Sequence, residues 1–84
     1  MARPSVPDRA LGEALRHMRQ ERGITLEALA FRSGITVSAL SRIELARTAP
    51  GWDTVRLLAR ALDVGMVELS AAVEGRALPP GLTR

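Results

Sequence analysis

Cysteine, lysine, tyrosine and asparagine are absent from the 84-residue sequence, and histidine, tryptophan and phenylalanine occur once each. The lack of cysteine excludes a disulfide scaffold, a thiolate metal site and a cysteine nucleophile. Because His17 is the one histidine, we expect no metal centre built on imidazole ligands, and nothing implies a cofactor. The sequence also lacks a glycine-rich phosphate loop and a set of serine, histidine and aspartate, so we expect no enzymatic activity.

Long apolar runs are missing as well. None reaches the roughly 18 residues that a membrane-spanning helix needs, and residues 1–7 lack the apolar stretch of a secretory signal. We therefore expect a cytoplasmic protein without a membrane partner. The length suits one small domain, leaving no second domain for a small-molecule ligand, and a partner subunit would add stability to so small a core.

Positive charge is carried by arginine alone. The sequence has 12 arginines and nine acidic residues, for a net charge of +3. Residues 1–50 hold eight arginines and five acidic residues, whereas residues 51–84 hold four of each. The arginine fork suits phosphate groups and guanine edges, so this imbalance indicates an anionic partner for the first part. Exclusive use of arginine also fits a bias in genome base composition.

Apolar residues recur at helical spacing in five segments, and none shows the sustained two-residue alternation of a strand. We predict helices at about 8–22, 25–33, 36–44, 52–62 and 66–73. Asp8, Thr25 and Thr36 are predicted N-caps, and Gly23 and Gly34 stand where helices end in a left-handed residue. The sequence therefore predicts an all-α domain at 8–74, with flexible segments at 1–7 and 75–84.

The second and third predicted helices are joined by a tight turn at Gly34, a residue that tolerates a positive φ. The outward residues of the third helix, which are Val37, Ser38, Ser41 and Arg42, are all small or polar. Such a helix can enter the major groove of DNA, which is about 12 Å wide. Arg42 is the one long donor on this face, so it is our candidate for base readout, the alternatives being a phosphate contact or a solvated charge.

Residues 11–69 resemble the helix-turn-helix family of phage repressor and Cro proteins, often called the XRE family. Three consecutive stretches carry the resemblance: LGEALRHMRQERGIT at 11–25, LEALAFRSGIT at 26–36 and VSALSRIELARTAP at 37–50. WDTV at 52–55 and LARAL at 58–62 match the fourth helix of the family. The resemblance implies a five-helix, phage-repressor-like DNA-binding domain that regulates transcription on double-stranded DNA. Controller proteins of restriction–modification systems are among the small regulators that this sequence resembles.

The resemblance also implies residue roles. The third helix and the turn after it would contact DNA through Thr36, Val37, Ser38, Ser41, Arg42 and Arg47. Val37 would meet a thymine methyl group, and Arg47 would contact phosphate. Arg19 and Glu44 match a pair that forms a salt bridge between the first and third helices of the family. The structural role of Glu44 is favoured because a carboxylate beside DNA needs a paired charge. A phosphate contact by Arg19 is the alternative.

Two positions depart from the family pattern. Leu26 replaces a glutamine that binds phosphate. Ala46 replaces a glycine that ends the third helix, so we expect this helix to run on by one or two residues, to about 46, and to shift Arg47.

The last two helices are expected to form the interface of a homodimer, because repressors of this type pair to match DNA half-sites about 34 Å apart. The apolar residues expected there are Leu57, Met66, Val67 and Val73. Phe31 would join this apolar patch, whereas Trp52 is expected in the core. The alternative function is a protein-interaction module with the same fold, such as an antitoxin or a regulatory partner, which Leu26, Phe31 and Leu57 favour.

Overall fold

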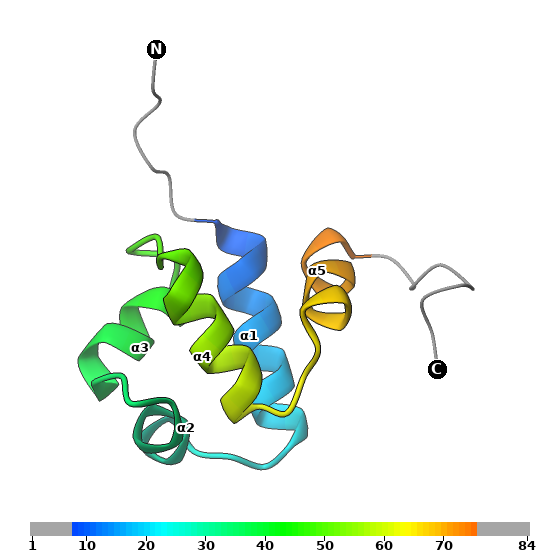
Figure 1. Cartoon of the computed structure of the whole chain (residues 1–84). Coiled ribbons are helices and arrows are strands. Elements are labelled where there is room, and N and C mark those ends of the chain that lie inside the picture. The colour runs from blue at the N-terminus through cyan, green and yellow to red at the C-terminus, as the bar shows by residue number, and fades with distance from the viewer. Residues whose placement is uncertain (1–7, 76–84) are drawn as a thin grey trace.

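The computed structural model describes residues 8–75 as five α-helices joined by short turns (Figure 1). The helices are α1 (Arg9–Glu21), α2 (Leu26–Ser33), α3 (Val37–Glu44), α4 (Trp52–Ala61) and α5 (Met66–Glu74). Within these residues there is no strand, which confirms the predicted all-α architecture, and the helix ends agree with the predicted ones to about one residue. The predicted flexible segments at 1–7 and 75–84 lie outside the described residues, apart from Gly75.

Side chains cap the first three helices as predicted. Asp8, Thr25 and Thr36 accept hydrogen bonds of 2.9 to 3.3 Å from backbone N–H groups two or three residues further along the chain. These bonds satisfy donors that have no partner within the helix. Gly51 and Gly65 occupy the same position before α4 and α5, without a side-chain bond. The three helices on the N-terminal side are therefore the ones whose starting points the sequence specifies most directly.

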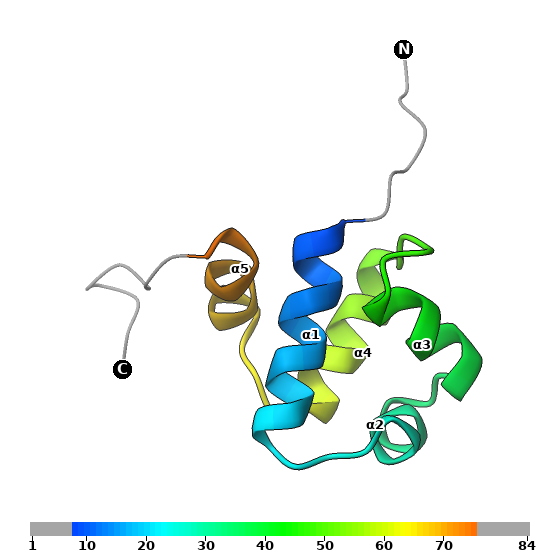
Figure 2. The same ribbon diagram turned by 180° about the vertical axis from the view of Figure 1, so that it is seen from behind.

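The turn between α2 and α3 depends on Gly34. Its φ of 77° lies in the left-handed region, and its N–H donates to the carbonyl of Ala30 at 3.0 Å. A residue with a Cβ would be strained in this conformation. Thr36, the N-cap of α3, follows only two residues later, so α3 begins directly after the turn and lies beside α2 (Figure 2).

The predicted extension of α3 to about residue 46 is wrong. The helix ends at Glu44, and Ala46 adopts a left-handed conformation with a φ of 57°. The N–H of Arg47 donates to the carbonyl of Arg42 at 2.8 Å, a bond that closes the end of a helix in the way a glycine usually allows. The left-handed backbone conformation of Ala46 therefore costs roughly 1–2 kcal/mol.

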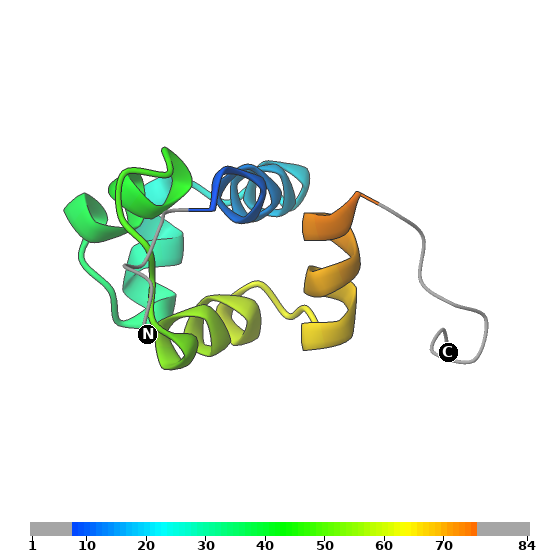
Figure 3. The ribbon, with the colours of Figure 1, turned by 90° about the horizontal axis from the view of Figure 1, so that it is seen from above.

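In Figure 3, α2 and α3 stand at one end of the molecule and α5 at the other, with α1 and α4 between them, and all five helices contribute side chains to the hydrophobic core. Its largest fully buried side chains are leucines: Leu15, Leu29, Leu40, Leu58 and Leu62. Burial of a leucine side chain contributes about 1.5–3 kcal/mol. Because α3 is held by Leu40 and Ile43 on one side only, its other side faces outward.

Trp52 does not belong to this core, contrary to expectation. Its side chain is 67% exposed. The buried side of α4 is formed by Val55, Leu58 and Ala59, and Trp52 stands at the first turn, where α4 extends beyond the core. It borders a small apolar cavity of about 240 Å³, which Leu11 and Leu69 also line.

Candidate nucleic-acid interface

The outward side of α3 forms the candidate interface. Ser38 and Arg42, which are four residues apart and therefore neighbours on one helix face, are exposed. Val37 is 39% exposed and Ser41 is half-buried beside it. No described residue covers this side of the helix, which lies at the edge of the molecule (Figures 1 and 2). A partner can therefore approach α3 closely and meet only one long side chain, that of Arg42.

Leu45 shares this face, a position that the sequence analysis missed. It is the residue at the end of α3 and is 53% exposed. Its distance of seven residues from Ser38, or two helical turns, places both on the same side. That spacing was visible in the sequence and would have identified Leu45 as part of the surface.

The N-terminus of α3 is prepared for an anion. Thr36 uses its Oγ1 as the acceptor for the N–H of Ala39, at 3.1 Å. The hydroxyl proton of Thr36 stays available as a donor to a phosphate oxygen. The dipole of α3 adds partial positive charge at the same end. Thr36 can therefore cap the helix and bind a phosphate group at the same time.

Behind α3, Arg19 and Glu44 form a bidentate ion pair between α1 and α3. Arg19 Nε lies 2.7 Å from Glu44 Oε2, and Nη2 lies 2.9 Å from Oε1. Nη1 donates to the carbonyl of Ile24 at 3.0 Å, so Arg19 also holds the loop between α1 and α2. The two side chains are only 13% and 5% exposed. This geometry leaves the guanidinium engaged with protein groups on three of its five N–H bonds.

The electrostatics of the pair follow from this geometry. The hydrogen bonds that Arg19 donates to Glu44 raise the pKa of Arg19 above its ordinary value, and the negative charges of Glu44 and Glu27 add to this, whereas burial acts in the opposite direction. Arg19 therefore stays charged, and its positive charge balances the negative charge of the Glu44 carboxylate. A buried acidic residue is tolerable beside a surface for phosphate only under this condition.

Arg47 is exposed in the turn that follows α3. Its backbone is tied to Arg42 by the 2.8 Å hydrogen bond described above. The left-handed conformation of Ala46 thus keeps two arginines together at the C-terminal end of α3. Two cations there suit a polyanionic partner.

The side of α2 differs from the family pattern. Leu26 is half-buried and packs against the hydrophobic core, so it replaces a polar contact with an apolar one inside the protein. Phe31 is 89% exposed. It makes no part of the core and stays as a large apolar side chain in solvent.

The four residues expected at a dimer interface fall into two pairs. Leu57 on α4 is 44% exposed and Val67 on α5 is 49% exposed. Met66 and Val73 are half-buried and pack against the core of their own chain. The outward apolar side chains of α4 and α5 are therefore Trp52, Leu57 and Val67, whereas Met66 and Val73 lie partly in the core.

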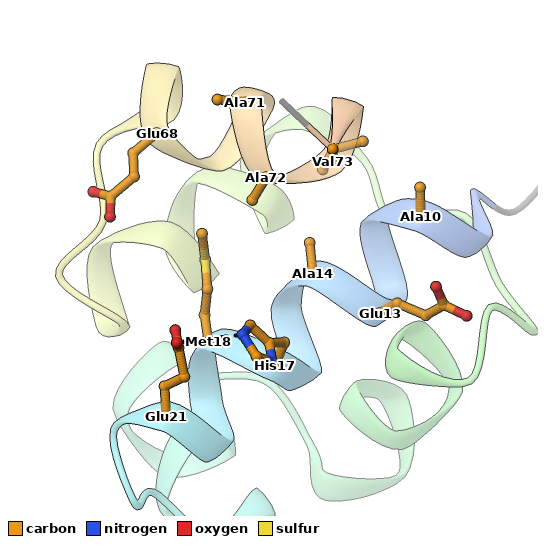
Figure 4. A pocket seen from close by; sticks show the side chains of 11 residues that line it. Ala10, Glu13, Ala14, His17, Met18, Glu21, Glu68, Ala71, Ala72 and Val73 are labelled. Carbon is orange, nitrogen blue, oxygen red and sulfur yellow. Dashed lines mark ion pairs between the residues drawn. The ribbon is translucent and has the colours of Figure 1, made fainter. Parts of the chain in front are cut away.

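A groove of about 560 Å³ lies between α1 and α5, at the end of the molecule away from α3 (Figure 4). Alanines, Met18 and Val73 line it, and Glu13, Glu21 and Glu68 stand at its sides. No arginine borders the groove, and its one histidine, His17, lies 3.3 Å from Glu21. Acidic side chains thus predominate here, although Glu13 is paired with Arg9 at 3.6 Å, whereas the exposed charges at the end of α3 are those of Arg42 and Arg47.

Between residues 8 and 75, no three histidine or acidic side chains gather closely enough to hold a metal ion. None of the five helices described has both the length and the apolar character to cross a bilayer.

A short helix, a tight left-handed turn and a second helix presented outward define a helix-turn-helix protein. In agreement, the family model described as a helix-turn-helix domain matches residues 10–72. The chain therefore belongs to the helix-turn-helix family, and within it to the XRE type of regulator, as the sequence resemblance predicted.

Relatives and solved structures agree with this assignment. The chain is 38% identical over 78 residues to the HTH-type transcriptional regulator DdrOP3 of Deinococcus deserti, a match that covers 86% of this chain and 60% of the relative. The chain thus spans less than two thirds of the length of that relative.

Two crystal structures share the fold. The clp gene regulator ClgR of Corynebacterium glutamicum superposes with a TM-score of 0.79 at 28% identity, over 89% of this chain and 96% of ClgR. The restriction-modification controller protein C.AhdI of Aeromonas hydrophila superposes with a TM-score of 0.70 at 33% identity, over 73% of this chain and 92% of C.AhdI.

Proposed function

We propose that the protein is a sequence-specific regulator of transcription that binds a palindromic DNA operator as a homodimer. The observation that carries this proposal is the outward side of α3, which is uncovered by described residues, bears one long donor and begins at a capping threonine. The protein acts by binding rather than by catalysis, and it acts in the cytoplasm. The names of its relatives, a transcriptional regulator and a controller protein, support this function.

The contacts follow from the positions along α3. Arg42 reads a guanine edge in the major groove and Val37 meets a thymine methyl group. Ser38 and Ser41 donate to bases or phosphates. Thr36 and Arg47, at the two ends of α3, hold the phosphate backbone. This division between base contacts and phosphate contacts is the usual one in protein–DNA interfaces.

Dimerisation uses α4 and α5. The exposed Leu57 and Val67 supply the apolar contact, and Met66 and Val73 support it from beneath. A two-fold axis through this surface would present two copies of α3 to successive major grooves, about 34 Å apart.

The test is selection of bound duplexes from a random pool, followed by titration of the selected sequence at several salt concentrations. We expect a palindromic consensus, and an affinity whose log–log slope against salt is about −0.9 for each phosphate contact. Failure to enrich any sequence, together with an affinity that does not depend on salt, would refute the proposal.

A protein-interaction module with the same fold is the second candidate. Phe31, 89% exposed on α2, is the observation that favours it, because aromatic side chains are enriched at protein–protein interfaces. Such a module would show no steep dependence on salt toward duplex DNA. The salt titration above therefore separates the two functions.

A further inference from the structure

Gly12 stands where α1 passes the last turn of α3. A Cβ added at this glycine would lie 2.6 Å from the carbonyl oxygen of Ile43 and 2.8 Å from that of Glu44. Real Cβ atoms are essentially never found at such distances. Both oxygens belong to the backbone, so neither can rotate aside. Any side chain at position 12 must displace the C-terminal end of α3 or α1 itself.

The local sequence gives no reason for a glycine here. Gly12 is the fourth residue of a 13-residue helix, where glycine is less favourable than alanine. It is buried, and the close approach of the two backbones accounts for its presence. The carbonyl of Ile43 accepts a hydrogen bond from the N–H of Ala46 at 3.1 Å, and together with that of Glu44 it also approaches Gly12 closely, where only a residue without a Cβ leaves room.

The same side of α1 holds α3 at a second point. Arg19 lies seven residues, or two turns, after Gly12 and binds the side chain of Glu44. Leu15, between them, is fully buried. Gly12 therefore sets the distance between α1 and the last turn of α3, and Arg19 prevents that turn from moving away. The first turn of α3 is held separately, by α2 and the turn at Gly34.

We propose that Gly12 is a positioning residue for DNA recognition. It fixes how closely the end of α3 packs on α1, and thereby the tilt at which α3 enters the major groove. The proposal rests on the proposed function. A methyl group at position 12 would push Ile43 and Glu44 outward and pivot α3 about its capped N-terminus. Arg42, the residue next to Ile43, would then miss the base edge, whereas flexible contacts to phosphate would adapt.

The experiment compares Gly12→Ala with Gly65→Ala. Gly65 has an ordinary φ of −74° and nothing within 4 Å of an added Cβ, so it is the matched control. Affinities are measured for the selected operator and for unrelated duplex DNA, at a temperature where circular dichroism shows each variant to be folded. For Gly12→Ala we expect operator affinity to fall about tenfold, as for one lost bidentate base contact. Binding to unrelated DNA should stay within about twofold, and Gly65→Ala should bind both as the unmodified protein does.

A double variant separates positioning from stability. In the background of Arg42→Ala, the Gly12→Ala change should cause almost no additional loss of operator affinity, because the contact that it misplaces is already gone. Independent, multiplicative losses would overturn the proposal. An equal fall on operator and unrelated DNA, or no fall at all in folded Gly12→Ala, would overturn it as well.

A second background keeps the test decisive if Gly12→Ala does not fold. Ala46→Gly removes the left-handed strain at the end of α3, and so restores stability without restoring the original packing on α1. The combined variant should be folded and non-specific, whereas Ala46→Gly alone should remain specific; a specific combined variant contradicts the proposal. If the unmodified protein shows no salt-dependent binding to duplex DNA, the proposed function itself fails, which is a different outcome from unchanged specificity in the variants.

Discussion

Arg42 combines two properties that recognition of a base requires. It is exposed, and it stands on a rigid helix whose other side is fixed in the core by Leu40 and Ile43. The guanidinium can form two parallel hydrogen bonds to guanine, an arrangement that lysine cannot reproduce. The small neighbours Ser38 and Ser41 let it approach the groove closely.

Replacement of this arginine should therefore affect one base pair. We expect Arg42→Ala to cost about 1–3 kcal/mol on the operator and to relax discrimination at one position of each half-site. Competition binding against a set of single-base operator variants measures both effects. Arg56→Ala, an exposed arginine on α4, is the control. If Arg42→Ala weakens binding to every sequence equally, its contact is to phosphate.

Arg47 should behave in the opposite way. As the proposed phosphate contact in the turn after α3, it would carry no sequence information. We expect Arg47→Ala to weaken binding on all sequences alike and to reduce the magnitude of the salt slope by about one. Titrations at four or more salt concentrations provide the slope. An unchanged slope with altered base preference would place Arg47 among the residues that read sequence.

Individual residues also show how far the sequence alone could lead. Capping by Asp8, Thr25 and Thr36 was predictable, because it depends on neighbours two or three residues away. The conformation of Ala46 was not, since an alanine accepts a left-handed φ only when surrounding structure holds the chain there. The exposure of Trp52 depends on how far the first turn of α4 extends beyond the core, and this is also decided by how the helices pack.

At the scale of the helices, α1 acts as the support for α3. The ion pair between Arg19 and Glu44 ties the two helices and the intervening loop together. It is nearly buried, so solvent screens it little, and removal of one partner leaves an uncompensated charge.

We expect Arg19→Met to destabilise the fold by on the order of 3 kcal/mol, with about 5 kcal/mol as the upper limit. Urea denaturation of the unmodified protein and the variant gives the difference. Arg16→Met, at an exposed position of the same helix, should change stability by less than about 0.5 kcal/mol. Equal effects of the two substitutions would show that the pair adds nothing beyond side-chain packing.

The pH dependence of this difference follows from the raised pKa of Arg19. A cation whose pKa is higher in the folded state contributes its full stabilisation at every pH below its unfolded value. That contribution disappears only as the pH rises through the folded value, beyond the ordinary range of arginine. The destabilisation caused by Arg19→Met should therefore be the same at about pH 7 and about pH 10.

The succession of helices was largely predictable from the sequence, because apolar spacing and caps are local signals. Their mutual packing was less so. The sequence placed Leu57, Met66, Val67 and Val73 together as one apolar surface, but Met66 and Val73 turn partly into the core. The spacing within α5 alone cannot say which of its faces meets α1 and α4.

At the scale of the whole molecule, the candidate interface with DNA and the apolar surface of α4 and α5 involve different helices. A dimer can therefore form without covering α3. This separation is what an operator with two half-sites requires.

A charge in the proposed dimer interface should separate the subunits. We expect Leu57→Asp to raise the dissociation constant of the dimer at least about tenfold, because an unpaired carboxylate would be desolvated there. Sedimentation equilibrium measures this constant. Arg16→Asp, at an exposed position of α1, is the control and should leave the dissociation constant unchanged. A dimer that tolerates aspartate at position 57 must pair through another surface.

The acidic groove between α1 and α5 has a consequence for the approach to DNA. Glu13, Glu21 and Glu68 border this groove, whereas Arg42 and Arg47 lie on α3 and in the turn after it. In the field of a polyanion, such a particle experiences a torque that turns its arginine end forward before the two bodies touch. Diffusive encounters thus begin already aligned, and unproductive collisions through α5 are repelled.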